Sequence, residues 1–140
     1  MEPGKIHHRA GYEKAKMLDH SGWTEIMPRK ITPSDIDFVV ELDGRVLAGE
    51  LKTDITEFKD MSHGQRRTYE TLARKGITVV LVKHGTPEGQ DINTITDVVS
   101  FQVMASKCGQ LLSSKVFPGK YWKKFLERWR DGLQGMNPEG

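Results

Sequence analysis

The sequence predicts a single α/β domain in which helices cover one mixed β-sheet. Two strand-like runs flank Asp43-Gly44, a dipeptide that favours a two-residue hairpin turn. A capped amphipathic helix then leads directly into residues 77–82, an almost continuously apolar run. Such a run is typical of a central strand beside a helical crossover. At 140 residues the chain has room for one compact core, so we expect one domain over 1–132 and a flexible tail at 133–140.

The first half of the predicted order begins with a helix and continues with a meander. Residues 8–20 place apolar side chains on one side of a helix, and Ser21-Gly22 is its stop signal. Strand-like runs follow at 23–27, 36–42 and 45–52. The last two form the predicted hairpin.

The second half begins at Ser62, which with Gln65 forms a Ser-x-x-Gln capping box. This helix ends at Gly76, because glycine commonly terminates helices. The remaining predicted elements are a strand at 77–82, a polar loop at 84–97, a strand at 98–104 and an amphipathic helix at 120–131. The order of the core is therefore α-β-β-β-α-β, followed by a strand and a helix, which predicts one mixed sheet flanked by helices.

Composition excludes several classes of protein. Hydrophobic residues make up 36% of the chain, charged residues 29%, and the mean hydropathy is -0.54, as in ordinary globular proteins. No apolar run approaches the roughly 20 residues that a bilayer span needs, and the N-terminus lacks the apolar region of a secretory signal. Together with the single cysteine, Cys108, these features predict a cytoplasmic protein without a membrane segment.

The net charge of +2 conceals a segregation along the chain. Residues 31–60 contain eight acidic and three basic residues, residues 61–85 five basic and one acidic, and residues 113–130 six basic and one acidic. An acidic segment between basic ones suits a divalent cation beside a polyanion such as nucleic acid, although solvated surface charge gives the same pattern.

The chemistry is expected on the predicted hairpin. A two-residue Asp43-Gly44 turn places Asp37 opposite Glu50. Because side chains alternate along strands, Asp35, Asp37, Glu50 and Lys52 then share one face. The opposite face is expected to form core, and its residues are Ile36, Phe38, Val40, Leu42, Leu47 and Leu51.

Two carboxylates directly opposite one another destabilise a sheet unless something offsets their repulsion. A proton, a neighbouring lysine or a divalent metal can do so. Asp37 and Glu50 supply hard oxygen ligands, and Lys52 brings an ammonium to the same face. This combination is typical of phosphodiester hydrolysis, in which a metal polarises the phosphate and a lysine stabilises developing charge or positions water.

These residues resemble the signature of the PD-(D/E)XK nuclease superfamily, an acid at the start of one strand and Glu/Asp-x-Lys on the next. The matching segments are SDIDFVVELDG and AGELKTD. Gln65-Arg66-Arg67-Thr68-Tyr69 is similar to the Q-x-x-x-Y element of the RecB, lambda exonuclease and VRR-NUC-like branch. The resemblance covers residues 8–85 and implies a restriction-endonuclease-like α-β-β-β-α-β core.

The resemblance also implies roles for single residues. The implied catalytic residues are Asp37, Glu50, Lys52 and Gln65, and the implied ligands of Mg²⁺ or Mn²⁺ are Asp37, Glu50, the Leu51 carbonyl and Glu13. Asp35 stays open as an alternative first acid. Residues expected to contact nucleic acid are Arg66, Arg67, Tyr69, Lys123 and Lys124.

Structural roles explain some of these residues equally well. Gln65 is accounted for by its capping box, Tyr69 by packing of a helix face on the sheet, and the aromatic side of the helix at 120–131 by the core.

The predicted function is a divalent-metal-dependent nuclease that hydrolyses phosphodiester bonds. We expect DNA rather than RNA as substrate, with recognition of structure, ends or backbone, as in small phage or mobile-element nucleases. The resemblance is compatible with a homodimer, since many such enzymes pair subunits to cut both strands, but the sequence shows no interface and leaves the oligomeric state open. The alternative hypothesis is a catalytically silent nucleic-acid-binding or assembly subunit of the same fold. A third hypothesis is an unrelated α/β protein in which the Glu50-Leu51-Lys52 motif is coincidental.

Overall fold

The computed structural model describes residues 19–53, 57–107, 109–112 and 115–133. The chain divides into two compact units, Met1–Pro33 and Ser34–Gly140, which are described separately. The helix predicted at 8–20 lies outside the described residues except for its last two positions, and Glu13 lies outside them.

The first unit corrects one prediction, because the strand expected at 23–27 is a short helix, α2 (Trp23–Ile26), followed by the 3₁₀ helix η1 (Pro28–Lys30). The Asp19 carboxylate accepts a hydrogen bond from the Ser21 N–H at 2.9 Å, and the Thr24 hydroxyl donates to the Ser21 carbonyl at 2.9 Å. These local bonds favour a helical turn over a strand. Pro28 then ends α2, because the residue before a proline is driven to extended backbone.

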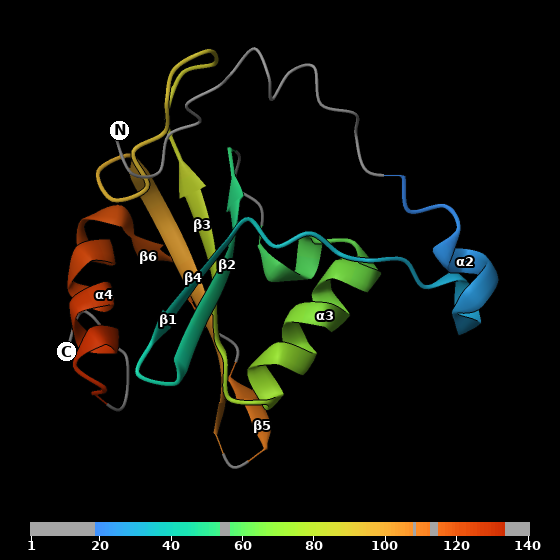
Figure 1. Ribbon diagram of the computed structural model, residues 1–140. Coiled ribbons are helices and arrows are strands. Elements are labelled where there is room, and N and C mark those ends of the chain that lie inside the picture. The colour runs from blue at the N-terminus through green and yellow to red at the C-terminus, as the bar shows by residue number, and fades with distance from the viewer. Residues whose placement is uncertain (1–18, 54–56, 108, 113–114, 134–140) are drawn as a thin grey trace. The chain divides into compact units, whose positions relative to one another are not determined.

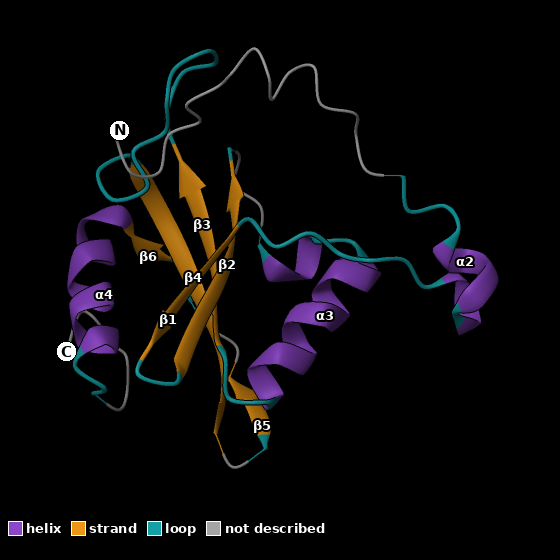
Figure 2. Ribbon diagram, viewed as in Figure 1, coloured by secondary structure: helices purple, strands orange, loops and turns teal. Residues whose placement is uncertain are grey.

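The second unit contains a six-stranded mixed sheet flanked by helices (Figures 1 and 2). Its strands are β1 (Phe38–Leu42), β2 (Arg45–Lys52), β3 (Thr78–His84), β4 (Val98–Lys107), β5 (Gln110–Leu112) and β6 (Phe117–Pro118). They lie in the order β1-β2-β3-β4-β5, and β6 also pairs with β4. The helices are η2 (Phe58–Asp60), α3 (His63–Arg74), η3 (Gly119–Tyr121) and α4 (Trp122–Arg130).

The pairing directions follow from the connections. β1 and β2 form an antiparallel hairpin, whereas β2 and β3, joined through α3, are parallel. Since a parallel pair requires a crossover, α3 covers the sheet between its two strands. The predicted central position of residues 77–82 is confirmed, because β3 lies between β2 and β4.

Two hydrophobic clusters lie on the two faces of the sheet. On one face Trp122, Phe125 and Trp129 of α4 pack against side chains that include Val80 and Phe101. On the other, Tyr69 and Ala73 of α3 pack with Phe58 and Met61 against Val79, Leu81 and Met104. Figure 2 shows α3 and α4 on opposite sides of the strands. The helices predicted from Ser62 and near residue 120 therefore both use their apolar faces as core, as expected.

The end of α4 is fastened to the hairpin by Arg45. Its guanidinium donates hydrogen bonds to the carbonyls of Trp129 and Arg130 and lies 5.0 Å from the centre of the Trp129 ring. Carbonyls in the last turn of a helix lack partners within the helix, so a cation there is favourable. Arg45 thereby connects the turn of the hairpin to the helix on the α4 face.

The hairpin register is as predicted, with Phe38 opposite Gly49 and Leu42 opposite Arg45. The predicted core face is correct in part. Leu47 is buried, and Phe38, Leu42 and Leu51 pack on the α4 cluster, but Ile36 and Val40 are 36% and 45% exposed. Val40 lies in the edge strand β1 and Ile36 precedes that strand, and neither side chain belongs to the cluster that packs with α4.

The last third of the chain holds two strands that were not predicted. β4 extends to Lys107, beyond the expected end at 104, and the short strands β5 and β6 both pair with it. Pro118 in β6 is tolerated because β6 is only two residues long and lies outside the main strand order. Among the described residues no helix is long and apolar enough to span a bilayer.

Gly49 provides a test of this packing. A Cβ on Gly49 would lie 2.7 Å from Val80 Cγ2 and 2.8 Å from the Val80 carbonyl oxygen, and it would overlap the Phe38 ring. We expect Gly49→Ala to lower the free energy of unfolding by about 2 kcal/mol, because a backbone atom and an edge-strand ring must both move. Chemical denaturation measures the change.

Gly64→Ala is the matched control, since a Cβ at this helical position would meet nothing within 4 Å. This variant should be as stable as the wild type or slightly more stable, because alanine favours helices. Equal stability of the two variants would contradict the packing described for Gly49.

Candidate active site

The predicted acids meet on the α3 face of the sheet, at the end of β2. Asp37 directly precedes β1, and its N–H donates to the carbonyl of Gly49 at 3.1 Å. Gly49 is the register partner of Phe38, so the regular hairpin pairing ends at Phe38 and Asp37 is bonded one position out of register. Glu50 lies on β2 with its carboxyl within hydrogen-bonding range of the Asp37 carboxyl, although neither group can donate while both are ionised. The two carboxyl groups predicted to face one another are therefore in contact.

Each acid is held by a further part of the chain. Asp37 Oδ2 accepts the Leu51 N–H at 2.7 Å. Glu50 Oε2 accepts the Tyr69 hydroxyl at 2.7 Å and a hydrogen bond from Gln65 Nε2. Because Gln65 and Tyr69 are four residues apart, they present side chains on the same face of α3. One helix face and one strand thus fix the orientation of Glu50.

Gln65 and Tyr69 resolve two alternatives that the sequence leaves open. Ser62 Oγ accepts the Gln65 N–H at 3.3 Å, so half of the capping box is present, but the Gln65 side chain binds Glu50. Tyr69 is fully buried and its hydroxyl is bonded to Glu50. The expectation that Tyr69 contacts nucleic acid is therefore corrected, because this side chain lies beneath the site and supports it.

The environment of Glu50 favours its protonated form. Only 5% of the residue is exposed. Burial raises the pKa of Glu50 to about 7, and the hydrogen bond and negative charge of Asp37 act in the same direction. The Tyr69 hydroxyl and the charge of Lys52 oppose this rise in pKa. At neutral pH the Glu50 carboxyl is therefore protonated for part of the time.

Lys52 ends β2 on the same face as Glu50, two residues further along. Leu51 points to the other face, where it packs on the α4 cluster. The other candidate first acid, Asp35, is exposed, and among the described residues it makes no hydrogen bond or ion pair. The geometry thus selects Asp37 as the partner of Glu50.

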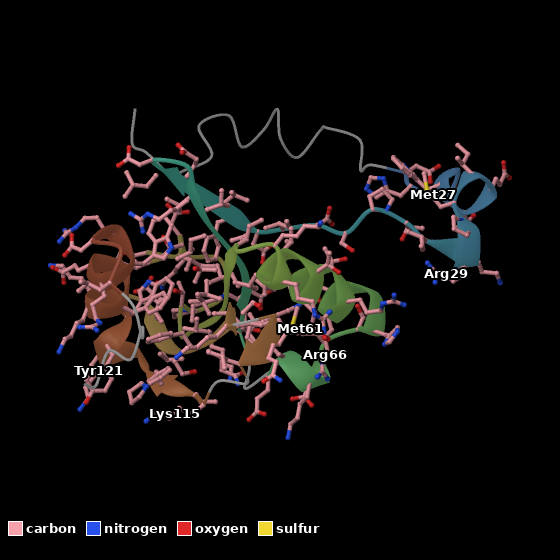
Figure 3. The ribbon with its side chains drawn as sticks, turned by 90° about the horizontal axis from the view of Figure 1, so that it is seen from below. Met27, Arg29, Met61, Arg66, Lys115 and Tyr121 are labelled. Carbon is pink, nitrogen blue, oxygen red and sulfur yellow. The ribbon has the colours of Figure 1, made fainter. Side chains whose placement is uncertain are left out.

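The basic residues expected to contact nucleic acid divide between two faces. Arg66 and Arg67 follow Gln65 on α3, both exposed, and Arg66 Nε lies 3.1 Å from Glu70 Oε1. Lys123 and Lys124 are exposed on α4, which covers the opposite face. Figure 3 shows this separation, with Arg66 on the α3 side and Tyr121, which precedes α4, on the other. The structure therefore does not bring Lys123 and Lys124 to the acids.

The described residues supply two carboxylates for a metal. No group of three or more His, Cys, Asp or Glu side chains gathers within that part of the chain. Two carboxylates nevertheless fit Mg²⁺, which is usually bound through one or two of them and completes its octahedron with water and substrate phosphates.

One residue of this face, Lys83 on β3, was not predicted from the sequence. It is buried on the α3 face in register with Lys52. The alternation of side chains along a strand could have found it. Lys83 is two residues after Leu81, so the two side chains point to the same face of the sheet, which is the face that α3 covers.

The raised pKa of Glu50 predicts how stability depends on pH. The pKa of Glu50 is about 7 when folded and 4.5 when unfolded, so its protonation stabilises the fold fully below pH 4.5, and this stabilisation is lost as pH rises through 7. Glu50→Gln keeps both acceptor contacts without the charge. We expect it to be roughly 1 to 3 kcal/mol more stable than the wild type at pH 8 and nearly equal at pH 4.

Urea denaturation of both proteins across this pH range measures the difference. Glu88→Gln, in the exposed loop after β3, serves as the control and should match the wild type at every pH. A stability difference for Glu50→Gln that does not change with pH would show that Glu50 is not protonated in the folded protein.

Comparison with known proteins was made at three levels. No family model, curated protein or solved structure matches this chain. Its function is therefore inferred from the chemistry of its own residues.

Proposed function

We propose that this protein is a divalent-metal-dependent nuclease that hydrolyses phosphodiester bonds in DNA. The observation that carries the proposal is the direct contact between the Asp37 and Glu50 carboxyls, on the face that also presents Lys52. Two adjacent acidic side chains destabilise the fold because their negative charges repel each other. A surface that only binds phosphates gains nothing from such acids, since they also repel phosphate. A site that must hold a cation next to a phosphate requires them.

The acids are suited to hold Mg²⁺ or Mn²⁺ between the ends of β1 and β2. Asp37 and Glu50 would supply the carboxylate oxygens, and the proton that Glu50 carries for part of the time at neutral pH would leave when the cation is loaded. A bound divalent cation supplies Lewis acidity toward the phosphate and lowers the pKa of water.

The remaining residues would orient these acids and handle charge. Tyr69 and Gln65 hold one oxygen of Glu50, and the Leu51 N–H holds one oxygen of Asp37, so each carboxyl keeps a second oxygen outside these bonds. Lys52 would donate to the scissile phosphate and stabilise the negative charge that develops as water attacks phosphorus. Arg66 and Arg67 would bind neighbouring backbone phosphates.

The resemblance to PD-(D/E)XK nucleases supports this proposal. The acid, the hairpin, the Glu-x-Lys strand, the Q-x-x-x-Y helix and the following parallel strand occur in the expected order. The departure is at residues 23–27, where a strand was expected ahead of the hairpin and a short helix is found. We propose a restriction-endonuclease-like core that lacks this strand.

Cleavage assays test the proposal. Labelled single-stranded, nicked, flapped, junction and plasmid DNAs would be incubated with Mg²⁺ or Mn²⁺. We expect Lys52→Ala to reduce cleavage by about 10²- to 10³-fold, because it removes a group that acts in the transition state, while DNA affinity should fall by only about 3- to 10-fold through the loss of one phosphate contact. Glu50→Gln should abolish metal-dependent cleavage.

Asp35→Asn is the matched control, since it removes a nearby acid that contacts neither Asp37 nor Glu50 among the described residues, and it should cleave like the wild type. Full activity in Lys52→Ala would exclude the assignment of this site. Binding of DNA without cleavage under either metal would instead favour a catalytically silent binding subunit.

A further inference from the structure

Lys83 is the least explained polar residue of the structure. It lies near the end of β3, and it is 1% exposed. Its Nζ is buried and has no hydrogen-bond partner among the described residues. Buried ammonium groups normally have an anionic partner, because burial removes the water that would otherwise solvate the charge.

The position of Lys83 connects it to the proposed active site. Val79 and Leu81 belong to the cluster beneath α3, so alternation places Lys83 on the same face. Lys83 is in register with Lys52 on the neighbouring parallel strand, and strands so paired lie about 4.8 Å apart. Two lysines therefore lie side by side where β2 and β3 end, next to Glu50 in the preceding row.

Packing alone does not account for this lysine. The residues before it on β3 are apolar, and a methionine of similar length would fill the same space without charge. A second lysine beside Lys52 adds repulsion between like charges. In open α/β sheets, ligands bind outside the carboxyl ends of the parallel strands, and β2 and β3 end together here.

We propose that Lys83 and Lys52 together form the binding site for one phosphate group of the nucleic-acid backbone. Lys52 contacts the phosphate, and Lys83 supplies a positive charge beneath it that the free protein leaves uncompensated. The Lys83 ammonium acts through the field, which is weakly screened because little water separates the two groups. This inference rests on the proposed function, since it places the phosphate beside Asp37 and Glu50.

Lys83→Met tests the inference, because methionine keeps the length and removes the charge. In EDTA, where hydrolysis is prevented, fluorescence anisotropy with a labelled DNA duplex should show binding about 3- to 10-fold weaker than in the wild type. Thermal unfolding of the same variant should occur at a higher temperature than in the wild type, by about 2 °C or more, because an uncompensated buried charge is gone. Lys83→Arg keeps the charge and should retain most of the DNA affinity.

Lys75→Met is the matched control, since it removes one exposed positive charge at the far end of α3. It should change DNA affinity by less than twofold and leave the unfolding temperature unchanged. Inorganic phosphate would be titrated in parallel. Competition by phosphate that is weakened in Lys83→Met supports a site for the phosphate group itself.

The outcomes separate this inference from the proposed nuclease. If wild-type protein cleaves DNA and Lys83→Met binds DNA as tightly as the wild type, the role of Lys83 is excluded and the nuclease stands. If no DNA is cleaved but Lys83→Met still weakens binding, the phosphate site stands and the nuclease does not. A Lys83→Met protein that unfolds at a lower temperature than the Lys75→Met control would overturn the inference, because Lys83 would then stabilise the fold.

Discussion

The contact between the Asp37 and Glu50 carboxyls depends on the length of a turn six residues away. Asp43 and Gly44 both adopt positive φ, 51° and 84°, as a two-residue hairpin turn requires. One more residue in this turn would shift the register by one position and send Asp37 to the α4 face. The whole candidate site therefore follows from a backbone conformation that glycine permits readily and that aspartate tolerates better than most residues.

The two faces of the sheet divide stability and chemistry between them. The α4 face carries aromatic contacts such as those of Phe101 with Trp122 and Phe125, at ring separations of 5.1 and 5.5 Å. The α3 face buries Glu50 and Lys83 among apolar side chains. Buried polar groups reduce stability unless they are fully bonded, so the well-packed opposite face allows the fold to tolerate them.

Local rules predicted the hairpin, its register and the two long helices, because the Asp43-Gly44 turn and the Ser62 cap act over a few residues. They failed at 23–27, where the hydrogen bonds of Asp19 and Thr24 outweigh strand propensity, and at β5 and β6, which exist only as partners of β4. In the site, alternation and register placed Asp37, Glu50 and Lys52 on one face. The sequence left open whether Tyr69 packs on the sheet or contacts nucleic acid. Alternation could place Lys83 on the α3 face but not its depth of burial, which depends on how α3 and its preceding segment pack on the sheet.

The α3 face of the sheet carries two unfavourable pairs of like charges, one acidic and one basic, and the two pairs lie close together. Asp37 and Glu50 bring two acidic groups together, whereas Lys52 lies in register with Lys83, whose buried ammonium has no hydrogen-bond partner among the described residues. Tyr69, Gln65 and the Leu51 N–H hold the acids in place, and the charge of Lys52 offsets the repulsion between them only in part, because the pKa of Glu50 stays raised. A ligand of a single charge would satisfy only one pair. A divalent cation accompanied by a phosphate satisfies both pairs at once, which is why a phosphodiester bound with a metal fits this face better than either partner alone.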